Sequence, residues 1–159
     1  MAHDTPDHRT AALAALAENF ELADIYVFGS RAAEFVRGAG GDIGPGADVV
    51  REGIGDDDRP PAGEPDLDVG IRPIQGRRLS ARRRAELMVA LEDLFDVPRV
   101  DLVIVPEAPP FLALAVISGE LIYCRDSTDQ AEYELYVLRR AGDLAPFEHA
   151  RRAHILGEA

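Results

Sequence analysis

The sequence predicts an α/β fold, in the looser α+β sense: a small mixed sheet flanked by helices. Short runs of β-branched and aromatic residues alternate with segments whose apolar residues recur every three or four positions. A stretch rich in Gly, Pro and Asp, at about residues 37–64, interrupts this alternation as a long insertion. A chain of 159 residues has room for one domain with a real core, and we expect a single domain over residues 1–159 with a C-terminal helical tail at about 127–159.

Composition and charge exclude several functions. All 17 basic residues are arginine, so no lysine is present to act as a nucleophile or to serve a P-loop. The formal net charge of −12 argues against broad electrostatic binding of DNA or RNA, because contacts with phosphates dominate that affinity. No apolar run approaches membrane-spanning length, and the first residues lack the features of a signal peptide. With a lone cysteine, Cys124, these features predict a cytoplasmic protein without nucleic-acid or membrane partners.

Periodicity and turn residues place the elements in order. Helices are expected at residues 9–20, 31–36, 80–95, 111–117 and 127–141, with a further turn or two at 147–156, and strands at 24–28, 66–71, 99–105 and 121–124. Residues 72–79 are predicted to form a polar, arginine-rich link, and Ser80 to cap the helix that follows. The cluster Arg82, Arg83 and Arg84 in the first turn of that helix opposes the helix dipole, so it requires either nearby acids or an anionic partner.

The first chemically interesting stretch is Gly29-Ser30-Arg31, between a strand and a helix. Glycine lets the backbone approach a ligand closely, a serine can cap the helix, and the free N–H groups of a helix start attract anions. The guanidinium of Arg31 adds a planar fork suited to phosphate. The alternative interpretation is an ordinary serine N-cap after a tight turn.

The second is Asp66-Leu67-Asp68 at the head of an apolar strand. Because side chains alternate along a strand, Asp66 and Asp68 point to one face while Leu67 points to the other. Two carboxylates so close repel each other unless a cation lies between them, and Mg²⁺ prefers such oxygens. Asp101 heads the next strand in the same way, so pairing of the two strands would bring three carboxylates to one edge. The alternative interpretation is that these acids are ordinary solvent-exposed residues at the starts of strands.

This order of motifs resembles the nucleotidyltransferase core of the DNA polymerase beta superfamily, and especially the minimal nucleotidyltransferase (MNT) proteins. Three stretches carry the resemblance: Phe28-Gly29-Ser30-Arg31-Ala32, Pro65-Asp66-Leu67-Asp68-Val69 and Val100-Asp101-Leu102-Val103. The segment Leu121–Asp126 and the helix after it are similar to the MNT partner of HEPN toxin–antitoxin pairs. The resemblance spans about residues 9–145. One departure is that 35 residues separate Ser30 from Asp66, where the family has a short connection, and this leaves the acceptor substrate open.

The resemblance implies a nucleotidyltransferase fold and an ATP-using transferase with two Mg²⁺ ions. Asp66 and Asp68 would hold both metals, and Asp101 the catalytic one, near the attacking hydroxyl. Gly29 and Ser30 would contact the β- and γ-phosphates of the nucleoside triphosphate, with Arg31 as a lesser contact. The implied partner is a HEPN ribonuclease toxin, AMPylated on a tyrosine and bound in a hetero-oligomer, which makes this chain the antitoxin.

Two other functions are compatible with the motifs. One is a nucleotidyltransferase that acts on a small, aminoglycoside-like hydroxyl compound, and the other is an antitoxin that neutralises its toxin by contact alone. The three intact aspartates disfavour the second, because a pure binder has no need of them. The net charge of −12 and the lack of a second substrate domain favour the AMP-transferring antitoxin over the first.

Overall fold

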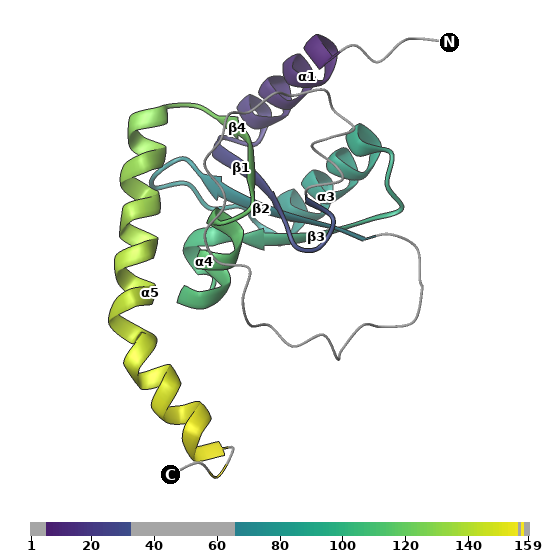
Figure 1. Cartoon of the computed structure of the whole chain (residues 1–159). Helices are drawn as coiled ribbons and strands as arrows, with labels where there is room; N and C mark the ends of the chain where they lie inside the picture. The colour runs from purple at the N-terminus through teal and green to yellow at the C-terminus, as the bar shows by residue number, and fades with distance from the viewer. Residues whose placement is uncertain (1–5, 33–65, 156, 158–159) are drawn as a thin grey trace.

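A computed structural model of the chain describes residues 6–32, 66–155 and 157. Its elements follow in the order α1 (Pro6–Asn19), β1 (Leu22–Phe28), β2 (Asp66–Pro73), α3 (Ala81–Phe95), β3 (Arg99–Ile104), the 3₁₀ turn η1 (Val105–Glu107), α4 (Pro110–Ile117), β4 (Glu120–Cys124) and α5 (Ser127–Ile155) (Figure 1). The predicted helix at 31–36 and the insertion at 37–64 lie outside the described residues, apart from the start of that helix at Ala32.

The four strands form one mixed sheet in the order β3-β2-β1-β4. Strand β1 pairs antiparallel with β2 and with β4, whereas β2 and β3 run parallel. A parallel pair needs a crossover, and α3 supplies it on one face of the sheet (Figure 1). The expected small mixed sheet flanked by helices is therefore confirmed.

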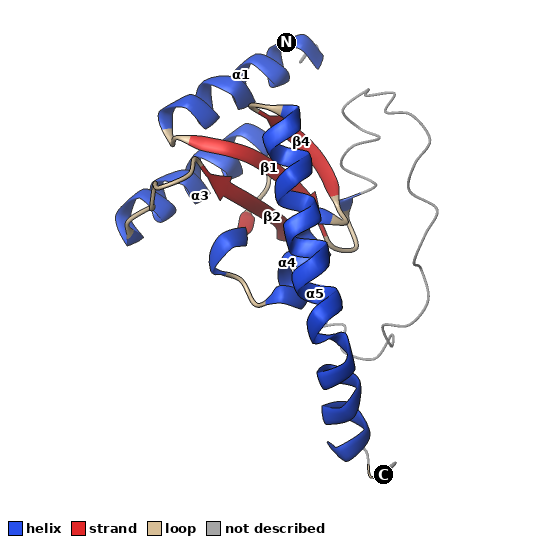
Figure 2. Cartoon of the chain, turned by 90° about the vertical axis from the view of Figure 1, so that its left-hand side faces the viewer, coloured by secondary structure: helices blue, strands red, loops and turns tan. Residues whose placement is uncertain are grey.

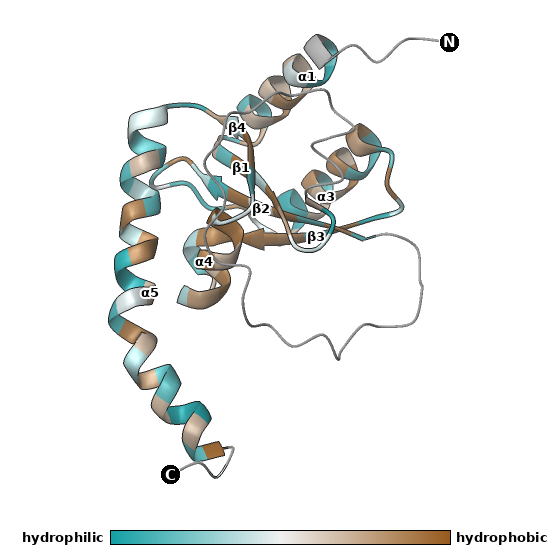
Figure 3. Cartoon of the chain, viewed as in Figure 1, coloured by the Kyte–Doolittle hydropathy of each residue, from teal (hydrophilic) through white to brown (hydrophobic). Residues whose placement is uncertain are grey.

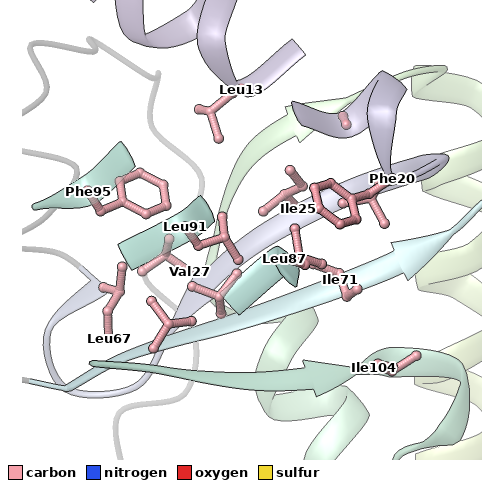
Figure 4. Packing of buried hydrophobic residues seen from close by; sticks show 14 of the residues in the cluster. Leu13, Phe20, Ile25, Val27, Leu67, Ile71, Leu87, Leu91, Phe95 and Ile104 are labelled. Carbon is pink, nitrogen blue, oxygen red and sulfur yellow. The ribbon is translucent and has the colours of Figure 1, made fainter. Parts of the chain in front are cut away.

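Side-chain alternation divides the interior into two cores, one on each face of the sheet. Leu67, Val69 and Ile71 of β2 point to the face that α1 and α3 cover, where they pack with Leu87 and Leu91 of α3 (Figure 4). The opposite face carries a smaller core beneath α4 and α5, built around Tyr26, Val105, Ala113, Val116 and Val137. Every residue of the short helix α4 is apolar, and Figure 3 draws most of it in brown, which fits a helix held between the sheet and α5.

Two predicted boundaries are wrong. Strand β2 continues through Arg72 to Pro73, because Arg72 pairs with Asp24 of β1 and is buried rather than part of a polar link. The helix expected to end at about residue 141 instead continues as α5 through Pro146 to Ile155, joins the turns expected at 147–156, and extends beyond the rest of the domain (Figure 2). Proline removes one backbone hydrogen bond from a helix interior but has a helical φ, and the helix continues past it with Glu148 paired to Arg151 and Arg152.

The arginine cluster at the start of α3 is compensated by acids within the chain. Ser80 accepts a hydrogen bond from the backbone N–H of Arg83, which confirms the predicted cap. Arg82 and Arg83 pair with Glu86, and Arg84 forms two hydrogen bonds with the carboxylate of Glu107. In the part of the chain that the structure describes, no helix has both the length and the apolar composition to cross a bilayer.

Candidate functional site

Every second residue of β2 faces the same side of the sheet, which places Asp66, Asp68, Gly70 and Arg72 in one row. Val116 of α4 fills the space beside Gly70 so closely that a Cβ on residue 70 would collide with it. Helix α4 therefore covers the middle of the row. The two acids lie at one end of the row and the arginine at the other, so this face offers two chemically distinct regions.

Strand register brings the predicted acids together. In the parallel pair, Asp68 lies opposite Asp101 and Asp66 lies opposite Arg99. Partners in adjacent strands point to the same face, so all three carboxylates and one guanidinium occupy the same edge of the sheet. The strand pairing thus brings Asp66, Asp68 and Asp101 to one edge, as the sequence predicts.

The electrostatics of this edge centre on Asp68. Its pKa is raised above the ordinary value, first by partial burial and then by the negative charges of Asp101 and Asp66. Within the described residues neither Asp66 nor Asp68 forms an ion pair with an arginine, whereas Glu21, Glu86, Glu107 and Glu148 elsewhere in the domain each do. An acid cluster that repels itself in this way is stabilised by a cation.

Asp101 already has a cation beside it. A guanidinium nitrogen of Arg99 lies 3.1 Å from Asp101 Oδ1, and both side chains are about half exposed or more, at 64% and 47%. Among the described residues no three acidic, imidazole or thiol groups stand arranged to hold a metal ion. The three acids are neighbours, but Asp101 is directed to Arg99.

Gly29 completes this edge from β1. Phe28 pairs with Asp68, and Gly29 follows with a φ of +80°, a conformation that glycine adopts without strain. A Cβ on residue 29 would collide with Asp68 Oδ2 and would lie 3.4 Å from Asp68 Cγ. Ser30 is exposed next to it, and the Ala32 N–H closes the turn on the Gly29 carbonyl at 3.3 Å. Gly29 of the predicted Gly-Ser turn therefore lies directly against Asp68.

The other end of the row holds a buried ion network that the sequence analysis missed. Arg72 donates to Asp24 at 2.5 Å and to Asp129 at 2.7 Å, and its guanidinium lies 4.6 Å from the centre of the Tyr133 ring. Burial raises the pKa of Asp24 against the opposing effect of Arg72. The missed signal is the period of two, because Arg72 follows Asp66, Asp68 and Gly70 on the same face.

A second polar network fixes α5 to the sheet. The buried Tyr26 hydroxyl accepts a hydrogen bond from Gln130 Nε2 at 3.1 Å and donates to Glu134 Oε1 at 3.3 Å. Gln130 also donates to Glu134. Burial is the main cause of the raised pKa of Glu134. These bonds join the middle of β1 to the first turns of α5.

A cavity of about 500 Å³ lies beside Arg72, away from the three aspartates at the other end of the row. It lies between the segment after β2, the turn η1 and α5, and is lined by Arg72, Arg77, Arg78, Tyr133 and Tyr136 among others. None of Asp66, Asp68 and Asp101 lines it. The edge of the sheet that carries Asp66, Asp68 and Asp101, called here the acid edge, is thus separate from this cavity, which lies at the other end of the row.

Comparison with known proteins relates the chain to one group of structures. No family model and no curated protein sequence matches the chain. A chain of a toxin–antitoxin complex with AMP-PNP is 17% identical, with a TM-score of 0.64 over 92% of this chain and 98% of that one. A chain from a complex of tri-AMPylated Shewanella oneidensis HEPN toxin with MNT antitoxin is 16% identical, with a TM-score of 0.61 over 95% and 98%.

A chain of the MntA–HepT toxin–antitoxin complex is likewise 16% identical, with a TM-score of 0.61 over 94% of this chain and 98% of that one. At such identities the likeness concerns the fold. It extends over nearly the full length of both chains in each comparison. The chain therefore has the nucleotidyltransferase fold of the minimal nucleotidyltransferase proteins found in MNT–HEPN toxin–antitoxin complexes.

Proposed function

We propose that this protein is a Mg²⁺-dependent nucleotidyltransferase that transfers AMP from ATP to a hydroxyl group, the acceptor being a tyrosine of a HEPN ribonuclease toxin. In this role the chain is the antitoxin of the pair. The single observation that carries the proposal is the register of Asp68 with Asp101, beside Gly29, in a fold shared with chains of MNT–HEPN complexes.

The chemistry of the donor set fits divalent metal ions. Three carboxylates from two adjacent strands supply only hard oxygen ligands, which Mg²⁺ prefers. The raised pKa of Asp68 reflects repulsion that a bound cation would relieve. Asp66 and Asp68 would hold both ions and Asp101 one of them, after it has left Arg99. A pair of such ions, when bound, neutralises the charge that develops on the entering and leaving oxygens of an in-line phosphoryl displacement.

The residues of this chain would position the two reactants. Gly29, which has no side chain, lets the backbone of the turn lie against Asp68, and Ser30 would donate a hydrogen bond from its hydroxyl to an oxygen of the β- or γ-phosphate. The acceptor oxygen attacks the α-phosphorus, the bond from that phosphorus to the bridging oxygen breaks, and pyrophosphate leaves with the electron pair. Asp101, at the edge of the site, would take the proton of the acceptor hydroxyl.

The choice of partner rests on the comparisons. A chain with this fold occurs in a complex with a tri-AMPylated HEPN toxin, and another occurs in a toxin–antitoxin complex that contains AMP-PNP. The present chain carries a formal net charge of −12, which suits a basic protein surface better than a nucleic acid. The same proposal implies that the antitoxin acts in the cytoplasm and forms a hetero-oligomer with its toxin.

The test is transfer of label from ATP to the HEPN protein encoded next to this chain, in the presence of Mg²⁺. Label from [α-³²P]ATP, but not from [γ-³²P]ATP, should enter the toxin with the wild-type chain and not with Asp66→Ala. The matched control is Asp143→Ala, which removes an exposed acid from α5 and should leave transfer unchanged. Absence of α-label in the toxin would contradict the proposal, and α-label in a small-molecule fraction would instead indicate the small-molecule transferase.

A further inference from the structure

Arg99 is the one basic residue placed within the acid edge by the strand pairing of β2 and β3. It lies opposite Asp66 in the register, and it faces the same side of the sheet as Asp101, two residues further along β3. Its guanidinium contacts Asp101 Oδ1 at 3.1 Å, and 64% of its side chain is exposed. Arg99 is therefore within reach of the carboxylates and free to move away from them.

The contact has a consequence for cation binding. A carboxylate oxygen that is held by a guanidinium is less available to a metal ion, because both cations compete for the same lone pairs. Among the described residues no preformed group of three ligands is present at this edge, which agrees with Asp101 being directed to Arg99. Binding of a divalent ion by all three acids requires that the contact between Arg99 and Asp101 be broken.

We propose that Arg99 is a built-in counter-ion of this site, which holds Asp101 when no divalent cation is bound and is displaced from it when the cation binds. The inference rests on the proposed function, since it concerns the same three acids. Arg99 is a positioning residue in this scheme: it acts through Asp101 and sets how tightly the site takes its metal.

The size of the effect follows from the exposure of the pair. Exposed ion pairs contribute little to stability, so their loss should change an equilibrium by roughly two- to five-fold. Replacing Arg99 with glutamine should tighten divalent-cation binding by that factor. Replacing it with lysine, which keeps the positive charge next to Asp101, should restore an affinity close to that of the wild type.

The experiment is a titration of the isolated chain with Mn²⁺, in which free Mn²⁺ is followed by electron paramagnetic resonance without nucleotide or partner. The variants are Arg99→Gln, Arg99→Lys, Asp101→Asn and the double variant Arg99→Gln/Asp101→Asn. Arg77→Gln is the matched control, because it removes one positive charge from another exposed ion pair, with Glu21, at 3.2 Å. Arg77→Gln should leave the Mn²⁺ dissociation constant unchanged.

The double variant separates the direct contact from a general effect of charge. If Arg99 acts through Asp101, then Arg99→Gln should tighten binding in the wild-type background and have no effect in the Asp101→Asn background. Equal Mn²⁺ affinities of wild type and Arg99→Gln, or the same tightening in both backgrounds, would overturn the inference and leave the proposed function standing. Failure of the wild-type chain to bind Mn²⁺ at all would contradict both.

Discussion

Asp68 on β2 and Asp101 on β3 lie directly opposite each other in the parallel pair, two like charges on one face of the sheet. Proteins normally avoid this arrangement, because like charges in register destabilise the sheet. Here the repulsion, together with partial burial, raises the pKa of Asp68. The protein thus retains a locally unfavourable pair of charges at the place where we propose a metal site.

Asp68→Asn should abolish nucleotidyl transfer and yet not destabilise the protein. The folded-state pKa of Asp68 is raised, so its ionised form opposes folding, and this penalty grows as the pH rises from the ordinary value of 3.8 through the raised one. At pH 7 the asparagine variant escapes the penalty, and its free energy of unfolding should equal or exceed that of the wild type by up to about 1 kcal/mol. Thermal unfolding at pH 7 and pH 4 measures this, and the difference should shrink at the lower pH. A clear loss of stability at pH 7 would be evidence against unrelieved repulsion.

Gly29→Ala should impair the acid edge through a collision rather than through backbone strain alone. An added Cβ meets Asp68 Oδ2, and the φ of +80° is strained for alanine. Gly76→Ala is the matched control, because Gly76 has the same φ of +80° and nothing within 4 Å of an added Cβ. Both variants should lose about 1–2 kcal/mol of stability from strain, but only Gly29→Ala should lose Mn²⁺ affinity and AMP transfer. Equal activity of the two variants would show that the turn does not contact the site.

Arg72→Met should be among the most destabilising substitutions in the chain. It leaves Asp24 buried without its cationic partner, and breaking a buried pair in this way costs about 3–5 kcal/mol. Asp24→Asn should cost less, because Arg72 keeps Asp129 and because the raised pKa of Asp24 shows that its charge is already poorly accommodated. Urea unfolding measures the loss of stability of both variants, and Arg77→Gln, which breaks an exposed ion pair, should lose less than about 1 kcal/mol. A larger loss of stability for Asp24→Asn than for Arg72→Met would contradict this interpretation of the network.

The C-terminal half of α5 should lose helical order in acid. Hydrogen bonds from Arg151 and Arg152 lower the pKa of Glu148 to about 2 from an ordinary value of 4.5. A lowered folded-state pKa gives a stabilising contribution that is present above pH 4.5 and is lost as the pH falls toward 2. Backbone amide shifts of residues 147–155 should change over that interval, and Glu148→Gln should remove the change. No difference between the two chains in this pH range would rule out a role for these pairs.

The sequence allows much of this structure to be predicted, and the failures have physical causes. Alternation in residues 66–71 identifies β2 and the shared face of its two acids, and the cap at Ser80 marks the start of α3. The extension of β2 through Arg72 was missed because a charged residue reads as a loop until its buried partner, Asp24 on another strand, is known. Helix α5 continues past residue 141, where the sequence analysis ends its main C-terminal helix, and tolerates Pro146 in its interior.

At the acid edge, too, the sequence predicts the local motifs but not the contacts between residues that lie far apart in the chain. The three aspartates and the Gly-Ser turn are each visible as motifs, but only strand pairing places Asp68 opposite Asp101 and Gly29 against Asp68. The proximity of Arg99 to Asp101 could have been read from their spacing of two in one strand. The position of Arg99 opposite Asp66 could not be predicted in this way, because the register of a parallel pair depends on a crossover that sequence alone does not fix.

The intact mass of the proposed HEPN partner after coexpression with this chain tests the central claim most directly. With the wild-type chain, the toxin should gain one or more AMP units on tyrosine, and with Asp68→Asn it should retain its unmodified mass while the two proteins still copurify. An unmodified toxin in the presence of the wild-type chain, ATP and Mg²⁺, or the same mass gain with the Asp68→Asn variant, would contradict the account.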